Sequence, residues 1–273
     1  MIPGKFEYFA PPTLPEAVKL LAEKGYGAKI LAGGQSLIPA MRFRLAAPEI
    51  LIDLNRIDGL SYIKEANGHL VIGAMTREAD LDASPIIHQK YPLLADTAKV
   101  IADPLVRNMA TIGGNLAHAD PANDHPATML AYKAQVVAVG PGVERTIPID
   151  EFFVDLFTSS LAENEILKEI RIPTPPAHSG GAYLKLERKV GDYAVAAVAV
   201  QLTLNSATCQ AIHIGLTNVS AVPMRAANAE AALTGQAVSD DNIRAAAAAA
   251  AQACEPSADC AAAKSTSVTW CGC

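Results

Sequence analysis

Two Gly-Gly pairs, eighty positions apart, constrain this 273-residue chain more than any other feature. The first lies in Ala32-Gly33-Gly34-Gln35-Ser36, directly after an apolar run, and the second lies in Thr111-Ile112-Gly113-Gly114-Asn115. Glycine adopts positive φ without a steric penalty and lets main-chain N–H groups approach a ligand closely. Successive exposed N–H groups form an anion-binding concavity. Two such loops predict the two halves of one nucleotide site, although a single pair is explained as well by a tight turn.

The spacing of these glycines excludes the two commonest nucleotide motifs. Neither pair fits Gly-x-Gly-x-x-Gly, and Gly-x-x-x-x-Gly-Lys-Ser/Thr does not occur. A Rossmann dinucleotide domain and a P-loop are therefore not expected.

Composition and charge exclude several function classes. The chain is 51% hydrophobic and 18% charged, its net charge is −6, and no block of Lys or Arg occurs, which argues against a nucleic-acid or anionic-membrane surface. It contains no run of eighteen apolar residues, so we expect no membrane span. Its first residues have no apolar signal-peptide pattern, so we expect no secretory signal. No cysteine precedes Cys209, as expected in a reducing cytoplasm. Cys271 and Cys273 lack a second pair at ligand spacing, so we predict no metal site and no iron–sulfur cluster in this chain.

The hydrophobic pattern predicts an α/β (α+β) chain of two domains. We expect helices at 15–24, 37–45, 92–101 and 126–133, and strands at 28–32, 50–54, 69–74, 135–139 and 166–172. Residues 173–181 are typical of a linker. After it we expect adjacent antiparallel strands at 194–204 and 209–216, and helices at 223–233 and 241–253. The predicted domains are 1–176, with subdomains of about 1–57 and 58–176, and 177–273.

Three long motifs, in order along the chain, resemble one family. They are residues 30–39 with Arg42-Phe43-Arg44-Leu45 behind them, residues 107–121, and Lys185-Leu186-Glu187-Arg188-Lys189-Val190-Gly191-Asp192-Tyr193-Ala194, with residues 214–219 as a further matching segment. Together they look like the medium, FAD-binding subunit of bacterial molybdenum hydroxylases of the xanthine oxidase family, which includes subunits of carbon monoxide, quinoline and nicotine dehydrogenases. The resemblance covers residues 6 to about 259.

The resemblance implies both a fold and a function. The fold is a two-subdomain FAD-binding fold of the vanillyl-alcohol-oxidase type with a small C-terminal domain of antiparallel sheet and helices. The implied function is electron relay through non-covalent FAD, from two [2Fe-2S] clusters of a small subunit to an external acceptor. Substrate is oxidised at a molybdenum cofactor in a large subunit, and the assembly is expected to be a cytoplasmic dimer of heterotrimers. No nucleophile–base constellation occurs, so we predict no catalytic side chain in this chain.

The resemblance also implies the cofactor-binding residues. These are Ala32, Gly33, Gly34, Gln35, Ser36 and Leu37 from the first loop, Thr111, Gly114 and Asn115 from the second, and Asp124, Leu167, Lys185 and Tyr193. The main chain of the first loop is expected to hold the pyrophosphate, because a diphosphate needs donors and a close backbone.

Four of these residues have a plain structural explanation as well. Asp124 either approaches the ribityl chain or flavin ring or caps the helix from Pro126, and both can hold. Tyr193 either covers one face of the isoalloxazine or lies at the edge of a Gly-Asp turn. Lys185 either places positive charge near the cofactor or is solvated. Leu167 either packs against the adenine or flavin rim or belongs to the core.

Other polar residues and the substrate are less constrained. His118 and His125 are expected to make local polar contacts, and Arg107 to fix the loop before Gly113 or to lie on the surface. Gln35 stands where carbon monoxide dehydrogenase relatives tend to have His, which favours N-heterocyclic or related organic substrates. The alternatives to an electron-relay subunit are a self-contained FAD oxidase of the vanillyl-alcohol-oxidase type and a flavin-free scaffold.

The end of the chain departs from the family. After Asp259 the apolar residues follow neither a helical nor a strand spacing. The same segment contains Cys260, Cys271 and Cys273, three of the five cysteines, and Trp270, the one tryptophan. One permitted codon choice, with a single C restored after the Asp259 codon, encodes Asp-Leu-Arg-Gly-Ser-Glu-Glu-Tyr-Lys-Arg, which looks like a helix start. We therefore interpret the tail as truncated or out of frame, and sequencing the gene tests this.

Overall fold

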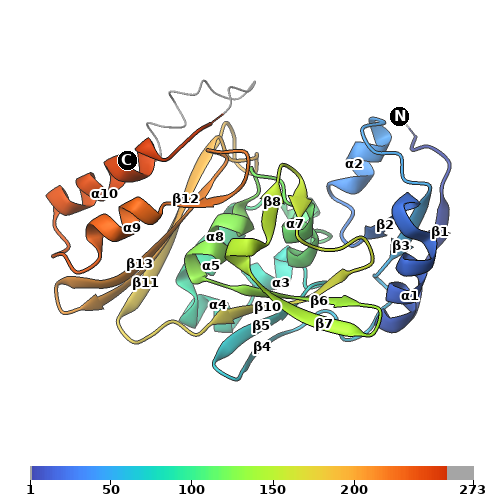
Figure 1. Cartoon of the computed structure of the whole chain (residues 1–273), viewed down its shortest axis with the longest axis horizontal. Helices are drawn as coiled ribbons and strands as arrows, with labels where there is room; N and C mark the ends of the chain where they lie inside the picture. The colour runs from blue at the N-terminus through green and yellow to red at the C-terminus, as the bar shows by residue number, and fades with distance from the viewer. Residues whose placement is uncertain (1, 257–273) are drawn as a thin grey trace.

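A computed structural model describes residues 2–256, and in it three β-sheets follow one another along the chain (Figure 1). The first is a three-stranded parallel sheet in the order β1-β3-β2. Its elements are β1 (Glu7–Phe9), α1 (Leu14–Lys24), η1 (Gly25–Gly27), β2 (Ala28–Leu31), α2 (Leu37–Arg42) and β3 (Ile50–Asp53). Thr13 caps α1 by accepting from the N–H of Glu16, and Gly25, at φ 65°, ends it. Val18 and Leu21 of α1 lie in the core of this subdomain.

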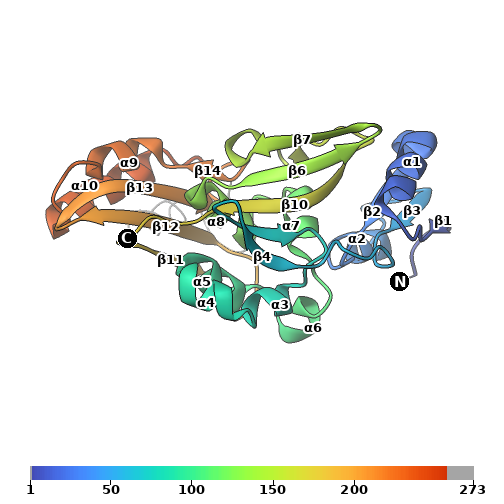
Figure 2. The same ribbon diagram turned by 90° about the horizontal axis from the view of Figure 1, so that it is seen from below.

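The second sheet is five-stranded and antiparallel, in the order β4-β5-β10-β6-β7. Its strands are β4 (Ile63–Ala66), β5 (His69–Gly73), β6 (Gln135–Gly140), β7 (Val143–Pro148) and β10 (Ile166–Pro173). The helices between them are α3 (Glu78–Asp82), α4 (Pro85–Lys90), α5 (Pro92–Val100), α6 (Pro104–Arg107), α7 (Ile112–His118) and α8 (Asp124–Tyr132), with η2 (Ile149–Glu151) after β7. The short hairpin of β8 (Phe153–Asp155) and β9 (Thr158–Ser159) precedes β10. Helices α3 to α6 lie together along one side of the molecule (Figure 2).

The third sheet is four-stranded and antiparallel, in the order β11-β12-β13-β14. Its elements are β11 (Ser179–Leu186), β12 (Ala196–Asn205), β13 (Thr208–Thr217), β14 (Met224–Arg225), α9 (Ala227–Leu233) and α10 (Asp240–Gln252). The predicted α/β (α+β) architecture, which ends in an antiparallel sheet with helices, is confirmed. The predicted linker at 173–181 is partly wrong, because β11 begins at Ser179, and the helix predicted from Pro223 begins only at Ala227, after β14.

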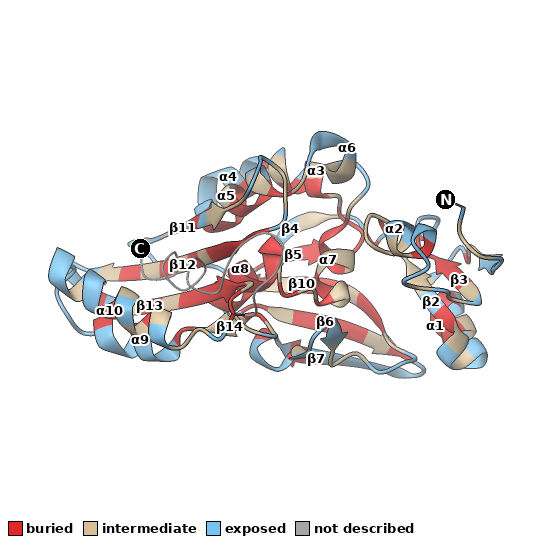
Figure 3. Cartoon of the chain, turned by 90° about the horizontal axis from the view of Figure 1, so that it is seen from above, coloured by how far each residue is buried: buried red, intermediate tan, exposed pale blue. Residues whose placement is uncertain are grey.

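Helix α8 joins the second and third sheets. All nine of its residues are buried, and Figure 3 shows it at the centre of the molecule. A methyl group at Gly215 of β13 would lie 2.7 Å from the carbonyl carbon of Ala127, so the helix backbone rests directly on the sheet. One apolar core consequently contains Ile72 of the second sheet, Met129 of α8 and Tyr183 of the third sheet.

Within residues 2–256, no helix is long and apolar enough to cross a membrane. The predicted out-of-frame tail after Asp259 lies outside the described residues.

Candidate functional site

The two glycine loops lie against each other. The first follows β2 and the second opens α7. A methyl group at Gly33 would lie 2.7 Å from Ala110 Cα, and one at Gly114 would lie 2.8 Å from Thr111 Oγ1 and 3.4 Å from Ala32 Cβ. The separations from Gly33 to Ala110 and from Gly114 to Thr111 Oγ1 are too short for a side chain, whereas 3.4 Å to Ala32 is an ordinary contact, so the close approach of the two loops depends on Gly33. Segments eighty residues apart thus form one surface.

The first loop leaves main-chain donors free. Within the described part of the chain, the N–H groups of Gly33, Gly34 and Gln35 donate no hydrogen bond to another main-chain group. Gly34 has φ 75°, in the left-handed region that favours glycine. Consecutive N–H groups without an internal acceptor suit a bound anion such as a diphosphate.

In the second loop the glycine N–H groups already donate hydrogen bonds within the protein, and one side-chain acceptor has no partner. The N–H of Gly114 donates to Thr111 Oγ1 at 3.1 Å, and the N–H of Gly113 donates to Ala74 O at 2.9 Å. Asn115 Oδ1 is buried with no hydrogen-bond partner among the described residues. A buried amide oxygen without a donor is costly unless a ligand supplies one. A free acceptor beside free N–H groups fits FAD, which carries both ribityl hydroxyls and a pyrophosphate.

Asp124 and Lys185 form a buried ion pair near the second loop. Lys185 Nζ donates to Asp124 Oδ2 at 3.0 Å and to Val100 O at 3.1 Å, and it lies 3.4 Å from Glu187. The Tyr183 hydroxyl donates to Asp124 Oδ1 at 2.6 Å. Burial raises the pKa of Asp124, and the charge of Lys185 offsets part of that effect. Burial also raises the pKa of Tyr183 well above its usual value, and the neighbouring carboxylate adds to the rise.

Two structural explanations offered above for these residues are wrong. Lys185 is not solvated, because only 3% of its side chain is exposed. Asp124 is not the cap of a helix from Pro126, because α8 begins at Asp124 itself and Asn123 is the N-cap residue. The carboxylate of Asp124 accepts from Tyr183 and Lys185 instead.

Tyr193 lies at the edge of the first loop and keeps its ring accessible. The residue is 53% exposed, and it follows a turn at Gly191, which has φ 80° and packs against Ala102. Although more than half of the residue is exposed, protein atoms around the Tyr193 hydroxyl desolvate that group and raise its pKa, the charge of Asp120 adds to the rise, and a hydrogen bond with the Ser36 side chain offsets part of it. An exposed ring beside the first loop can stack on a flat ligand.

The remaining predicted residues have local roles in the structure. Leu37 begins α2. Leu167 of β10 is 5% exposed and belongs to the main core, as its plain explanation required. Arg107 donates to the carbonyls of Ile101 and Ala102, so it fixes the segment before α6 rather than the one before Gly113.

Both histidines make local contacts. His125 Nε2 lies 2.7 Å from Glu78 Oε2, with both side chains fully buried. His118 lies 3.9 Å from Asp120, and burial lowers the pKa of this imidazole. Among residues 2–256, no group of three or more His, Cys, Asp or Glu side chains could hold a metal ion.

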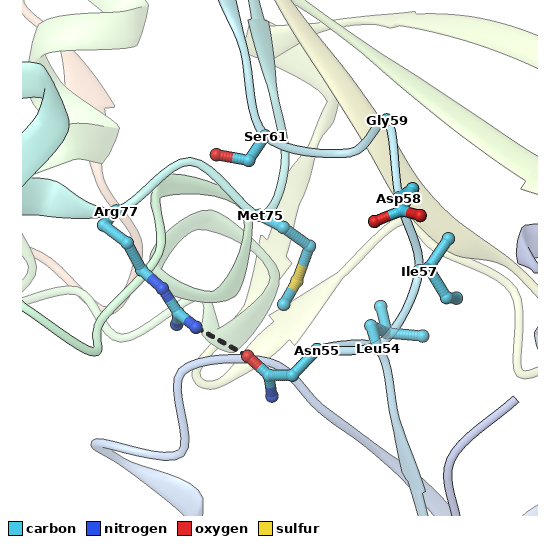
Figure 4. A pocket seen from close by; sticks show the side chains of 8 residues that line it. All are labelled: Leu54, Asn55, Ile57, Asp58, Gly59, Ser61, Met75 and Arg77. Carbon is cyan, nitrogen blue, oxygen red and sulfur yellow. Dashed lines mark hydrogen bonds between the residues drawn. The ribbon is translucent and has the colours of Figure 1, made fainter. Parts of the chain in front are cut away.

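Asn55 and Arg77 tie the two loops together, although neither was predicted from the sequence. Asn55 Nδ2 donates to Ala32 O at 2.8 Å, and Arg77 donates to Met109 O and, at 2.6 Å, to Asn55 Oδ1. Figure 4 shows this Arg77–Asn55 bond at the wall of a pocket of about 310 Å³. The pocket is lined by Leu54, Asn55, Ile57, Asp58, Gly59, Ser61, Met75 and Arg77, none of which was predicted as a site residue. An isolated Asn and Arg carry no motif signal, so only their partners identify them.

Comparison with known proteins identifies relatives over nearly the whole chain. Residues 4–175 match the model of the FAD binding domain in molybdopterin dehydrogenase, and residues 181–265 match that of the CO dehydrogenase flavoprotein C-terminal domain. The carbon monoxide dehydrogenase medium chain of Hydrogenophaga pseudoflava is 49% identical over 95% of this chain and 90% of its own length. The 6-hydroxypseudooxynicotine dehydrogenase complex subunit alpha of Paenarthrobacter nicotinovorans is 40% identical over 94% and 87%.

A solved structure is similar throughout. The carbon monoxide dehydrogenase of Hydrogenophaga pseudoflava, in a form that lacks the Mo-pyranopterin moiety of the molybdenum cofactor, aligns with a TM-score of 0.98 and 49% identity. The alignment covers 100% of this chain and 95% of that one.

Proposed function

Since the chain belongs to the family of FAD-binding medium chains of carbon monoxide dehydrogenase-type molybdenum hydroxylases, we propose that it relays electrons from a partner's iron–sulfur clusters to an external acceptor through non-covalent FAD. The chain is an oxidoreductase subunit. The observation that carries the proposal is the contact between the two glycine loops, where free N–H groups of Gly33, Gly34 and Gln35 lie on one loop and the unpartnered Asn115 Oδ1 on the other.

Each loop has a distinct role in this proposal. The main chain of residues 32–36, with Leu37 behind it, donates to the pyrophosphate. Thr111, Gly114 and Asn115 close the site from the second subdomain, and Tyr193 covers one face of the flavin ring. Bound FAD supplies the redox chemistry, while the protein binds and orients it.

In this proposal the buried Asp124–Lys185 ion pair fixes the orientation of the Asp124 carboxylate. The ammonium of Lys185 already has Asp124 Oδ2, Val100 O and Glu187 around it. We therefore propose that Lys185 affects the cofactor through the orientation of Asp124, not through direct contact with a phosphate. Leu167 supports the site from the core.

The proposal extends to partners and location. A large subunit would hold the molybdenum cofactor and a small one two [2Fe-2S] clusters, in a cytoplasmic dimer of heterotrimers. The names of the relatives support a multi-subunit complex, since they are a medium chain and a subunit alpha. Cys209 is a buried free thiol, which is compatible with a reducing compartment.

The substrate of the complex is a separate proposal. Gln35 favours an N-heterocyclic or related organic substrate, whereas the higher identity to a carbon monoxide dehydrogenase chain favours carbon monoxide. Because oxidation takes place in the large subunit, assays of the whole complex with each substrate class decide between them.

The test is FAD binding by the purified chain and its reduction within the complex. We expect one FAD per chain, released by denaturant, and FAD reduction by substrate only when the large and small subunits are present. Reduction of the FAD by substrate in the isolated chain would instead indicate a self-contained oxidase. A chain that stays colourless after incubation with FAD would indicate a flavin-free scaffold.

A further inference from the structure

Glu78 and His125 form a fully buried pair that the proposed flavin site does not use. His125 Nε2 lies 2.7 Å from Glu78 Oε2, and neither side chain is exposed to solvent. The other two polar atoms of the pair, Glu78 Oε1 and His125 Nδ1, have no hydrogen-bond partner among the described residues. A buried charge is very costly unless it is paired, and each buried polar atom without a partner adds to that cost. Apolar side chains would fill the same space at lower cost, so packing alone does not explain the pair.

The pair joins the segment before the second glycine loop to the start of α8. Glu78 is the first residue of α3, and its N–H donates to Ala110 O at 3.0 Å, directly before Thr111. His125 is the second residue of α8 and follows Asp124. The contact between Glu78 and His125 therefore connects the backbone that leads into the second loop with the turn of helix that carries Asp124.

Other bonds also hold this turn of α8 in place. Asn123, the N-cap residue, donates from Nδ2 to Asn115 O at 2.9 Å. The carbonyl of Asn123 accepts from Thr217 Oγ1 of β13 at 3.3 Å. Because these bonds do not involve His125, a substitution of His125 changes the charge near Asp124 more than the position of the helix.

Charges on two elements act on the Asp124 carboxylate. Burial raises the pKa of Asp124, the ammonium of Lys185 opposes the rise by direct contact, and the positive charge of His125 opposes it further. The titratable side chains around Asp124 and His125 include Tyr183, Lys185 and Glu187 of the β11 segment, Tyr193 and, on α3, Glu78. Since Glu187 competes with Asp124 for the Lys185 ammonium, a second cation near Asp124 affects how readily this carboxylate ionises.

We propose that Glu78 and His125 are positioning residues of the flavin site, in which the imidazolium paired with Glu78 keeps the neighbouring Asp124 carboxylate ionised. This inference rests on the proposed function, because Asp124 faces a flavin only if the chain binds FAD there. The Glu78–His125 pair is neutral as a whole, so its direct effect on the potential of a flavin is small. An ionised Asp124, in contrast, places negative charge beside a group that takes up electrons and lowers its midpoint potential. The pair thus acts on the flavin through Asp124.

Two variants remove the charge of His125 in different ways. His125→Gln keeps an N–H that can donate to Glu78, whereas Glu78→Met/His125→Leu replaces both partners by apolar groups and leaves no buried ion unpaired. The control is His213→Gln, because His213 is a part-buried imidazole that lies 3.9 Å from Glu230 in the C-terminal domain.

The first measurement is the titration of the Asp124 carboxyl group. We follow it by carbon-13 NMR of the whole chain labelled in aspartate, with Asp124→Asn to assign the signal. Protonation of Asp124 should move to higher pH in His125→Gln and in Glu78→Met/His125→Leu, and it should stay in place in His213→Gln. The proposal is overturned if the titration stays in place in the folded variants, or if it moves equally in His213→Gln.

The bound flavin provides a second measurement. In the FAD-loaded chain, we determine the midpoint potential across the pH range for wild type and for His125→Gln, and for Asp124→Asn with and without His125→Gln. At a pH where Asp124 is protonated in His125→Gln and ionised in wild type, His125→Gln should have the higher potential. In the Asp124→Asn background the same substitution should change nothing, and an equal effect in both backgrounds overturns the proposal. If the wild-type chain binds no FAD, the proposed function fails, whereas the NMR titration still decides whether the pair controls the charge of Asp124.

Discussion

Removal of the buried ammonium in Lys185→Met should destabilise the chain strongly. Lys185 and Asp124 are 3% and 8% exposed, and their charged atoms lie 3.0 Å apart. Without the ammonium, the carboxylate would keep only the Tyr183 hydroxyl as a side-chain partner. Breaking a buried pair by removing one partner typically costs about 3–5 kcal/mol. We expect a loss of that size in the free energy of unfolding at pH 7, measured by urea denaturation with far-UV circular dichroism.

A second variant separates charge from packing. Asp124→Asn/Lys185→Met removes both charges, so it should cost less than the sum of the two single substitutions, with a coupling energy of roughly 1–3 kcal/mol. Lys168→Met is the control, because Lys168 and Glu144 are 33% and 46% exposed and an exposed pair contributes about 0–1 kcal/mol.

The pH dependence of Lys185→Met has a definite sign. Burial raises the folded-state pKa of Asp124 above its usual 3.8. This carboxyl therefore costs no stability below pH 3.8, where it is protonated in both states, and lowers the free energy of unfolding as the pH rises from 3.8 to its folded-state pKa. Loss of the Lys185 charge enlarges the rise, and the defect should shrink as the pH falls from 7 towards 4. The reasoning is refuted if Lys185→Met costs no more than Lys168→Met, or if the two substitutions at Asp124 and Lys185 are additive.

Three further predictions test the site and the C-terminal sheet. Gly33→Ala places a methyl group against the Met109–Ala110 backbone and should abolish FAD binding in a fluorescence titration, whereas Gly180→Ala, which meets no atom within 4 Å, should bind normally. Tyr193→Ala should weaken FAD binding at least tenfold and shift the flavin absorbance, and an unchanged spectrum would count against stacking. Burial alone would raise the pKa of Glu230, but hydrogen bonds from surrounding donors hold it at about 2. The stability that Glu230 contributes should therefore be complete above pH 4.5 and decline towards pH 2, and Glu230→Gln should remove this decline in acid denaturation.

Local signals in the sequence predicted many of the elements. Pro15 and Gly25 mark the ends of the helix predicted at 15–24, which is α1, and the apolar runs predicted β2, β3, β6 and β10. These signals act over a few neighbouring residues, so they can be interpreted without knowledge of the fold.

Elements that depend on distant partners were missed. Gly180 and Gly181 were interpreted as linker, yet they lie in β11, where a methyl group at Gly181 would meet Val200 O at 2.7 Å and Leu93 Cβ at 2.9 Å. A Gly-Gly pair in a sequence is usually interpreted as a turn or linker, but in a sheet glycine also allows another backbone to approach closely. Only the positions of the neighbouring strand and helix show which of the two applies. β7 was missed because five of its six residues, all but Ile147, are exposed on an edge strand and carry no apolar alternation.

Two glycine loops with small polar residues after apolar segments can be recognised in the amino-acid sequence, because the backbone freedom of glycine needs no partner. The contact between the loops, the bonds by which Asn55 and Arg77 join them, and the burial of Lys185 against Asp124 depend on how the chain packs. A charge can be buried only where a partner of opposite charge comes within hydrogen-bond distance, and residues sixty positions apart meet only after the helix and the sheet have packed.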